Sequence, residues 1–249
     1  MNQALGIDDP ETTLKRSAVI KKKRFLNRLY RSWYEEIVGH IPRRLDGAML
    51  ELGSGAGFFK QIAPGAITSD ILRLPIVDVT LDARRLPFKA ASLRAIVMVD
   101  VFHHIQDAAE FLSEAQRCLK LGGRVVMIEP WLTTCSGWIY RFLHAEPCRP
   151  HVSNWSFSKG GPLSQANSAL PWLIFSRDLH KWPQTLSLIE LSEVRLHTPL
   201  RYLLSGGVSC PVSLPGSFFD AAGRLESLMQ PWIKWCAMFA TIVLTRRGG

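Results

Sequence analysis

The chain has 249 residues, of which 47% are hydrophobic and 20% are charged. This balance excludes a disordered or fibrous protein and fits one α/β domain with an elaborated subdomain. The net charge is +9, with +5 in residues 1–44, zero in residues 45–149 and +4 in residues 150–249. Basic ends of this kind suit a nucleic acid, an anionic membrane surface, an anionic substrate or plain solubility.

The five cysteines are odd in number and include no C-x-x-C pair. This argues against a disulfide framework and predicts a reducing, cytoplasmic compartment. No stretch reaches the roughly 18 uninterrupted apolar residues of a membrane span, and no apolar signal segment is visible. A soluble protein is expected, with association to a membrane surface left open. The histidines outside the pair His103–His104 are scattered, so no metal site is predicted.

Residues 1–44 are expected to form a basic N-terminal cover helix over a ligand pocket. A polar lead-in at residues 1–14 precedes a helical pattern at residues 15–38. Apolar side chains recur there at helical spacing: Ile20, Phe25, Leu29, Trp33 and Ile37. The same basic amphipathic pattern also predicts peripheral contact with a membrane surface.

Residues 45–131 alternate short apolar strands with turns and helices, which predicts a doubly wound, mostly parallel sheet. Seven strands are expected, at residues 48–52, 66–70, 77–81, 93–99, 124–129, 186–197 and 238–246. Helical segments are expected at residues 58–62, 107–119 and 218–228, the second one capped by Gly122 and Gly123. Such a sheet binds its ligand at the carboxyl ends of the strands.

Residues 132–249 complete the same domain with a substrate-lid insertion and the last strands. Residues 131–183 are rich in Pro, Gly, Ser and Trp and are too long for a bare connector. They predict a lid, and its tryptophans together with Trp33 are candidates for the wall of an apolar or aromatic acceptor pocket. The candidate substrate-binding residues are Trp33, Trp131, Trp138 and Trp172, with the loop 203–214 adding selectivity.

The strongest motif is Leu50-Glu51-Leu52-Gly53-Ser54-Gly55-Ala56-Gly57, which follows the first strand. Glycines let a backbone turn sharply and approach a ligand without Cβ obstruction. The spacing G-x-G-x-G differs from the dinucleotide fingerprint and from a Walker loop. An acidic residue, Asp70, ends the next strand, where a carboxylate could bind both hydroxyls of a ribose.

Three further motifs follow in order: Asp82-Ala83-Arg84-Arg85-Leu86-Pro87-Phe88, Val99-Asp100-Val101-Phe102-His103-His104-Ile105, and Leu119-Lys120-Leu121-Gly122-Gly123-Arg124. With these residues, the segment 46–131 resembles the class I S-adenosylmethionine-dependent methyltransferases, in particular the group with D-A-x-x-L-P-F and L-x-x-G-G motifs. The resemblance implies a Rossmann-like fold with an antiparallel last strand. It implies S-adenosylmethionine as cofactor and S-adenosylhomocysteine as product.

The resemblance also assigns the cofactor residues. The glycine turn would hold the amino-acid end of the cofactor, Asp70 the ribose, Asp82 the adenine, and the segment 100–104 the methionine side. The candidate cofactor-binding residues are Glu51, Gly53, Ser54, Gly55, Gly57, Asp70, Ile71, Asp82, Ala83, Asp100 and Val101. The connection between Asp70 and Val77 departs from the family because it is too short for a crossover helix.

The predicted function is methyl transfer to a small or medium organic acceptor with an apolar or aromatic part. His104, His103 and Glu129 are candidate bases, needed only if the nucleophile must lose a proton. Three alternatives stay open: a lipid-linked or isoprenoid acceptor at a membrane surface, an RNA or protein acceptor, and a non-catalytic cofactor-binding subunit. DNA is not an expected partner.

Overall fold

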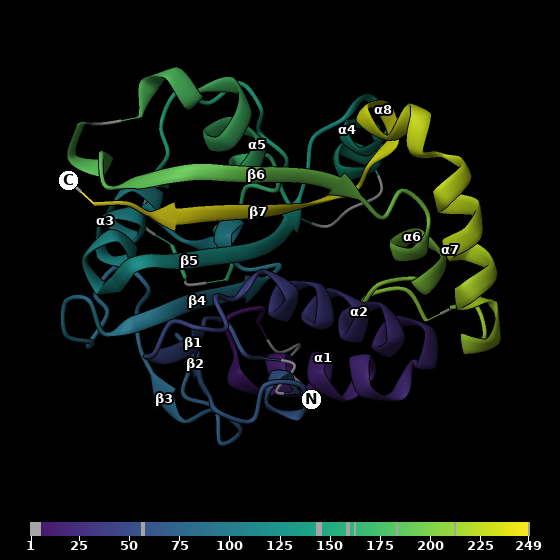
Figure 1. Cartoon of the computed structure of the whole chain (residues 1–249). Helices are drawn as coiled ribbons and strands as arrows, with labels where there is room; N and C mark the ends of the chain where they lie inside the picture. The colour runs from purple at the N-terminus through teal and green to yellow at the C-terminus, as the bar shows by residue number, and fades with distance from the viewer. Residues whose placement is uncertain are drawn as a thin grey trace.

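The computed structural model describes residues 6–55, 58–142, 146–157, 160–161, 163–182, 184–211 and 213–248. Seven strands form one sheet in the order β3-β2-β1-β4-β5-β7-β6 (Figure 1). The strands are β1 (Ala48–Glu51), β2 (Ala66–Asp70), β3 (Val79–Thr80), β4 (Leu93–Val99), β5 (Leu119–Pro130), β6 (Ile189–His197) and β7 (Phe239–Arg246). Strands β1 to β5 are parallel, and β7 is antiparallel to both β5 and β6. The predicted α/β class and antiparallel last strand are confirmed.

The helices cover both faces of this sheet. The α-helices are α1 (Pro10–Lys22), α2 (Arg24–His40), α3 (Ala108–Cys118), α4 (Thr134–Phe142), α5 (Leu170–Trp172), α6 (Arg201–Ser205), α7 (Phe219–Leu228) and α8 (Ile233–Cys236). Short 3-10 or π turns are η1 (Phe59–Gln61), η2 (Phe102–His104), η3 (Leu173–Arg177), η4 (Leu179–Lys181), η5 (Gln184–Leu186), η6 (Gly216–Phe218) and η7 (Gln230–Trp232). None of the helices in the described ranges combines the length and the apolar character needed to cross a bilayer.

The side chains of the central strand β4 pack against the helices on both faces of the sheet. Ala95 and Val97 point to the face covered by α2, while Ile96 and Met98 point to the face covered by α3. This alternation follows from the two-residue period of a strand, and all four side chains are fully buried. Each large apolar side chain buried in this way stabilises the fold by roughly 1.5–3 kcal/mol.

The N-terminal segment forms two helices where one was predicted, and it begins earlier than expected. Asp9 caps α1 by accepting a hydrogen bond from the Glu11 amide at 2.8 Å, with Pro10 at the first position. The chain turns extended at Lys23, which separates α1 from α2. The Lys23 ammonium donates to the carbonyl oxygens of Gly207 and Cys210, so the break connects these helices to the 206–210 loop.

The second and third strands pair in parallel without a crossover helix. Asp70 lies opposite Thr80, although only a short connection separates the two strands. Asp78 fixes the end of this connection to β2. Its carboxylate accepts hydrogen bonds from the amide and the hydroxyl of Thr68, at 2.8 and 3.0 Å. The predicted departure from the family is therefore a real feature of the chain, and an aspartate side chain supports it.

The predicted cap of the helix before β5 is corrected. Helix α3 ends at Cys118 with Leu119 as its cap, so Gly122 and Gly123 do not cap it. Gly122 instead takes a left-handed conformation inside β5, where the pairing with β4 shifts register.

The second half of the Trp-rich insertion packs against the sheet. Leu170 and Ile174 of this segment are fully buried in the core on the α3 face of the sheet. Asp178 is also buried, and its carboxylate binds Arg177, Lys181 and the indole of Trp155. This part of the insertion belongs to the hydrophobic core, and the predicted lid stays a prediction.

Candidate functional site

A cavity of about 630 Å³ opens at the carboxyl ends of the parallel strands. Its sheet side contains eight of the candidate cofactor-binding residues: Gly53, Gly55, Asp70, Ile71, Asp82, Ala83, Asp100 and Val101. His104 also lines it. The opposite side is made by Thr13 and Arg16 of α1 and by Leu203 and Val208 beyond β6. The structure therefore brings separate sequence motifs to one cavity, and α1 covers it.

The glycine turn lies close to two other segments. Gly53 has a left-handed φ of 65°, and a Cβ there would overlap the γ-methyl groups of Val101. A Cβ on Gly55 would approach Cγ2 of Thr13 to 2.7 Å. A side chain at Gly53 would therefore collide with the turn after β4, and one at Gly55 would collide with α1. Gly57 lies outside the described residues.

Glu51 is fully buried behind the turn and does not line the cavity. The Ser54 hydroxyl donates to its carboxylate at 2.6 Å, and Tyr34 of α2 bonds to it as well. The Ser54 hydroxyl also accepts from the Ser69 amide at 3.1 Å, which ties the turn to β2. Burial raises the pKa of Glu51 to about 7, and these hydrogen bonds only partly offset that shift.

The raised pKa of Glu51 predicts a pH dependence of stability. The folded chain holds the Glu51 proton between pH 4.5 and about 7, whereas the unfolded chain releases it. The free energy of unfolding is therefore expected to fall as the pH rises through this window. Urea unfolding should show this fall in the wild type relative to Glu51→Gln, which keeps an acceptor for Ser54 but does not titrate. The same dependence of the free energy of unfolding on pH in the two proteins would contradict the raised pKa of Glu51.

Two acidic side chains at the ends of β2 and β3 face the cavity. Asp70 is buried, and its Oδ1 accepts from the Leu72 amide at 2.9 Å. Burial raises its pKa, although the hydrogen bonds from the Leu72 and Ile71 amides oppose the shift. Asp82 is more exposed and pairs with Arg84, with Nη2 2.6 Å from Oδ2. The Arg84 guanidinium therefore already binds the Asp82 carboxylate, which the resemblance implies would contact the adenine of the cofactor.

Asp100 begins the turn after β4 in a left-handed conformation, with φ of 61°. Such a conformation is strained for a residue with a side chain and is concentrated at functional sites. Burial raises the pKa of Asp100 to about 7, and the charges of Glu146 and Glu129 add to this shift. The next turn residues are held by Glu129, whose Oε1 accepts from the amides of Val101 and Phe102 at 2.8 and 2.7 Å.

The paired histidines have different environments. His103 is fully buried, with Nδ1 2.8 Å from Glu129 Oε2 and Nε2 3.1 Å from Glu146 Oε2. Burial lowers the pKa of His103, but the two carboxylates outweigh it and hold the pKa well above its usual range. Burial and the His103 charge lower the pKa of His104 to about 3, so its ring is neutral.

The three candidate bases differ in their access to the cavity. His104 lines the cavity, whereas the side chains of His103 and Glu129 are buried behind it. A base must reach the proton that it removes. Among the three, His104 is the one with access to a ligand in the cavity.

The four candidate acceptor tryptophans do not line the cavity, and the structure places them apart. Trp33 is 2% exposed and packs in the core against Phe239, while Trp131 and Trp172 pack on the opposite face of the sheet. Trp138 is 67% exposed on α4. The apolar stripe of α2 that suggested membrane contact is likewise buried inside the molecule.

Trp33 and Trp138 offer a matched test of these positions. Trp33→Phe is expected to lower the free energy of unfolding by about 1–2 kcal/mol, because it leaves a void and removes the indole hydrogen bond to Thr198. Trp138→Phe should change it by less than about 0.5 kcal/mol. Equal losses in chemical denaturation would contradict the buried position of Trp33.

Sequence reasoning missed three residues of the site. Tyr34 reaches Glu51 from α2, Arg16 lines the cavity from α1, and Glu146 contacts both histidines. None of them lies in a motif, and each meets the site only through long-range packing. The helical spacing of the N-terminal segment was the one signal that could have found Tyr34.

The sheet order, the glycine turn and the acidic strand ends together define the class I fold of S-adenosylmethionine-dependent methyltransferases. Residues 50–127 match the family described as a methyltransferase domain. No curated protein matches the chain by sequence.

Solved structures share this fold at low sequence identity. One is the structure of geranyl diphosphate C-methyltransferase from Streptomyces coelicolor A3(2) in complex with Mg²⁺, geranyl diphosphate and S-adenosyl-L-homocysteine. Its sequence is 15% identical to this chain, the match covers 92% of this chain and 82% of that one, and the TM-score is 0.51. A geranyl diphosphate methyltransferase in complex with S-adenosylmethionine is 13% identical, the match covers 93% of this chain and 90% of that one, and the TM-score is 0.52. A chain of the Haloferax volcanii complex with the Trm112 methyltransferase activator has 12% identity over 96% of each chain, TM-score 0.55. At these identities the likeness concerns the fold.

Proposed function

We propose that the chain transfers the methyl group of S-adenosylmethionine to a small or medium organic acceptor with an apolar part. The observation that carries this proposal is the cavity, which combines an acidic, glycine-lined end with an apolar end. Its volume of about 630 Å³ falls within the range of ligand pockets.

The residues at the acidic end fit the cofactor. The two glycines let the turn approach Val101 and Thr13 closely, and Asp70 offers a buried carboxylate beside Gly55. Asp70 would accept from the ribose hydroxyls, Asp82 and Ala83 would contact the adenine, and the turn at Asp100 would border the methionine side. The bound cofactor would supply a methyl group already activated by its positive sulfur.

The remaining residues of the cavity would orient the acceptor and exclude water. Ile139, Tyr202, Leu203 and Val208 provide an apolar wall opposite the strand ends. The loop 203–214 is thereby favoured over the tryptophans as the part that selects the acceptor. Positioning and desolvation would account for most of the rate in such an in-line displacement. Among the three candidate bases, His104 is the one that borders the cavity, and its pKa of about 3 makes it a weak base for an acceptor that must lose a proton.

A methyl-transfer assay with S-adenosylmethionine labelled in its methyl group tests this function. Panels of aromatic and aliphatic alcohols, amines and acids are compared with isoprenoid lipids in vesicles, RNA and protein. Label in a small-molecule product, lost in Asp70→Ala, is the expected result. Label only in RNA, protein or the lipid fraction would contradict the proposed acceptor class.

A further inference from the structure

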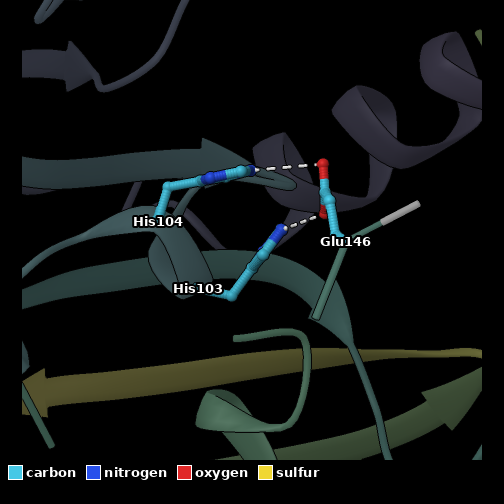
Figure 2. A group of neighbouring side chains, drawn as sticks. All are labelled: His103, His104 and Glu146. Atoms are coloured by element: carbon cyan, nitrogen blue, oxygen red, sulfur yellow. Dashed lines mark hydrogen bonds and ion pairs between the residues drawn. The ribbon is translucent and has the colours of Figure 1, made fainter. Parts of the chain in front are cut away.

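The side chains of His103, His104 and Glu146 converge on one point beside the cavity. Figure 2 shows the two imidazole rings side by side, each directed at a different oxygen of the Glu146 carboxylate. His103 Nε2 lies 3.1 Å from Oε2, and His104 Nε2 lies 3.6 Å from Oε1. One potential ligand atom from each residue lies within 4.8 Å of the other two.

These separations suit ligands of one metal ion. Two atoms that each lie about 2.1 Å from an ion at an angle of 90–109° are about 3.0–3.4 Å apart. The distances of 3.1 and 3.6 Å lie close to that range, and they run to the two different oxygens of Glu146. The three ligand atoms lie within 4.8 Å of one another and would move closer together to share one ion.

Glu129 orients the ring of His103. Its carboxylate lies 2.8 Å from Nδ1, which leaves Nε2 directed at Glu146. The two carboxylates keep His103 protonated in the absence of a metal, so an ion would displace the Nε2 proton when it binds. Histidines that bind metal commonly have such a carboxylate partner, which fixes the tautomer and orients the ring.

His104 directs its own Nε2 at the same carboxylate. This nitrogen lies 3.6 Å from Glu146 Oε1, beyond ordinary hydrogen-bond distance, and the residue borders the cavity. An ion between the two rings would bind the Nε2 lone pair of His104.

The charges are compatible with a divalent ion at this place. The protonated His103 balances one of the two carboxylates, Glu129 and Glu146, and a divalent ion that displaces its proton would balance both. Two nitrogen ligands and one carboxylate are typical of Zn²⁺ and of non-haem Fe²⁺, whereas Mg²⁺ prefers oxygen ligands.

We propose that His103, His104 and Glu146 bind a divalent first-row transition-metal ion, with Glu129 as the residue that positions His103. Three protein ligands leave at least one coordination position open. Because His104 and Glu146 both line the cavity, a polar group of the acceptor would reach that open position. Metal binding itself does not depend on the proposed methyl transfer.

The test uses the full chain after treatment with a chelator, titrated with Co²⁺ and Zn²⁺ in the absence of S-adenosylmethionine. The expected result is one Co²⁺ per chain with ligand-field absorption in the visible, displaced by Zn²⁺ and not by equal Mg²⁺. Glu146→Gln should weaken the binding at least tenfold, and Glu129→Gln about 10–100-fold. Glu110→Gln, on the exposed face of α3, is the matched control and should bind as the wild type does.

Circular dichroism of each variant separates a lost ligand from a lost fold. Absence of Co²⁺ binding to the wild type would overturn the proposal. Binding that survives Glu146→Gln unchanged would overturn it too, since the ion would then sit elsewhere, for example on the exposed thiols of Cys135 or Cys210. Because no methyl donor is present, either result leaves the proposed function to its own assay.

Discussion

Replacing Asp70 with alanine is expected to weaken S-adenosylmethionine binding about a hundredfold. The buried carboxylate faces the cavity from the end of β2 and is proposed to accept from both ribose hydroxyls. A hydrogen bond to a charged group contributes about 1.5–3 kcal/mol. The loss of two such bonds therefore corresponds to at least two orders of magnitude in Kd. Calorimetric titration measures the effect.

Two further variants make this experiment specific. Asp70→Asn keeps the acceptor for the Leu72 amide, so a loss of about tenfold is expected. Asp46→Ala removes an aspartate that is 89% exposed and paired with Lys120, and its affinity should match the wild type. Unchanged affinity in Asp70→Ala would refute the ribose assignment.

Replacing Gly53 with alanine is expected to destabilise the chain and to abolish cofactor binding. A left-handed alanine costs roughly 1–2 kcal/mol, and overpacking against Val101 adds about 1–3 kcal/mol. The free energy of unfolding should therefore fall by about 2–5 kcal/mol. Urea unfolding and calorimetric titration measure the two effects.

The surroundings of Gly53 provide the controls. Gly65→Ala meets open space and should change stability little. Val101→Ala removes both γ-methyl groups, so the double variant Gly53→Ala/Val101→Ala should lose less than the sum of the single losses. Strict additivity would show that the close approach to Val101 does not limit this position.

The sequence was most informative where the chemistry is local. The glycine turn, Asp70 and the segment around Asp100 follow consecutive strands, and parallel strands end at the same edge of a sheet. Their meeting at one cavity therefore follows from the strand order alone. The missing crossover after Asp70 was also visible, because a count of residues suffices to exclude a helix there.

Contacts between distant segments could not be predicted. The hydrogen bond from Tyr34 to Glu51 and the approach of Glu146 to the histidines depend on how α2 and the segment after α4 pack. The tryptophans were misleading for a related reason. Large aromatic side chains suit a core as well as a ligand pocket, and Trp33 lies in the core.

The cavity at the strand ends is proposed to bind S-adenosylmethionine. Calorimetric titration of the purified chain with S-adenosylmethionine and with S-adenosylhomocysteine measures this binding. The predicted result is binding of both molecules at one site per chain, with affinities in the micromolar range. Binding of neither would contradict the claim and would show that the chain alone does not form an adenosine site.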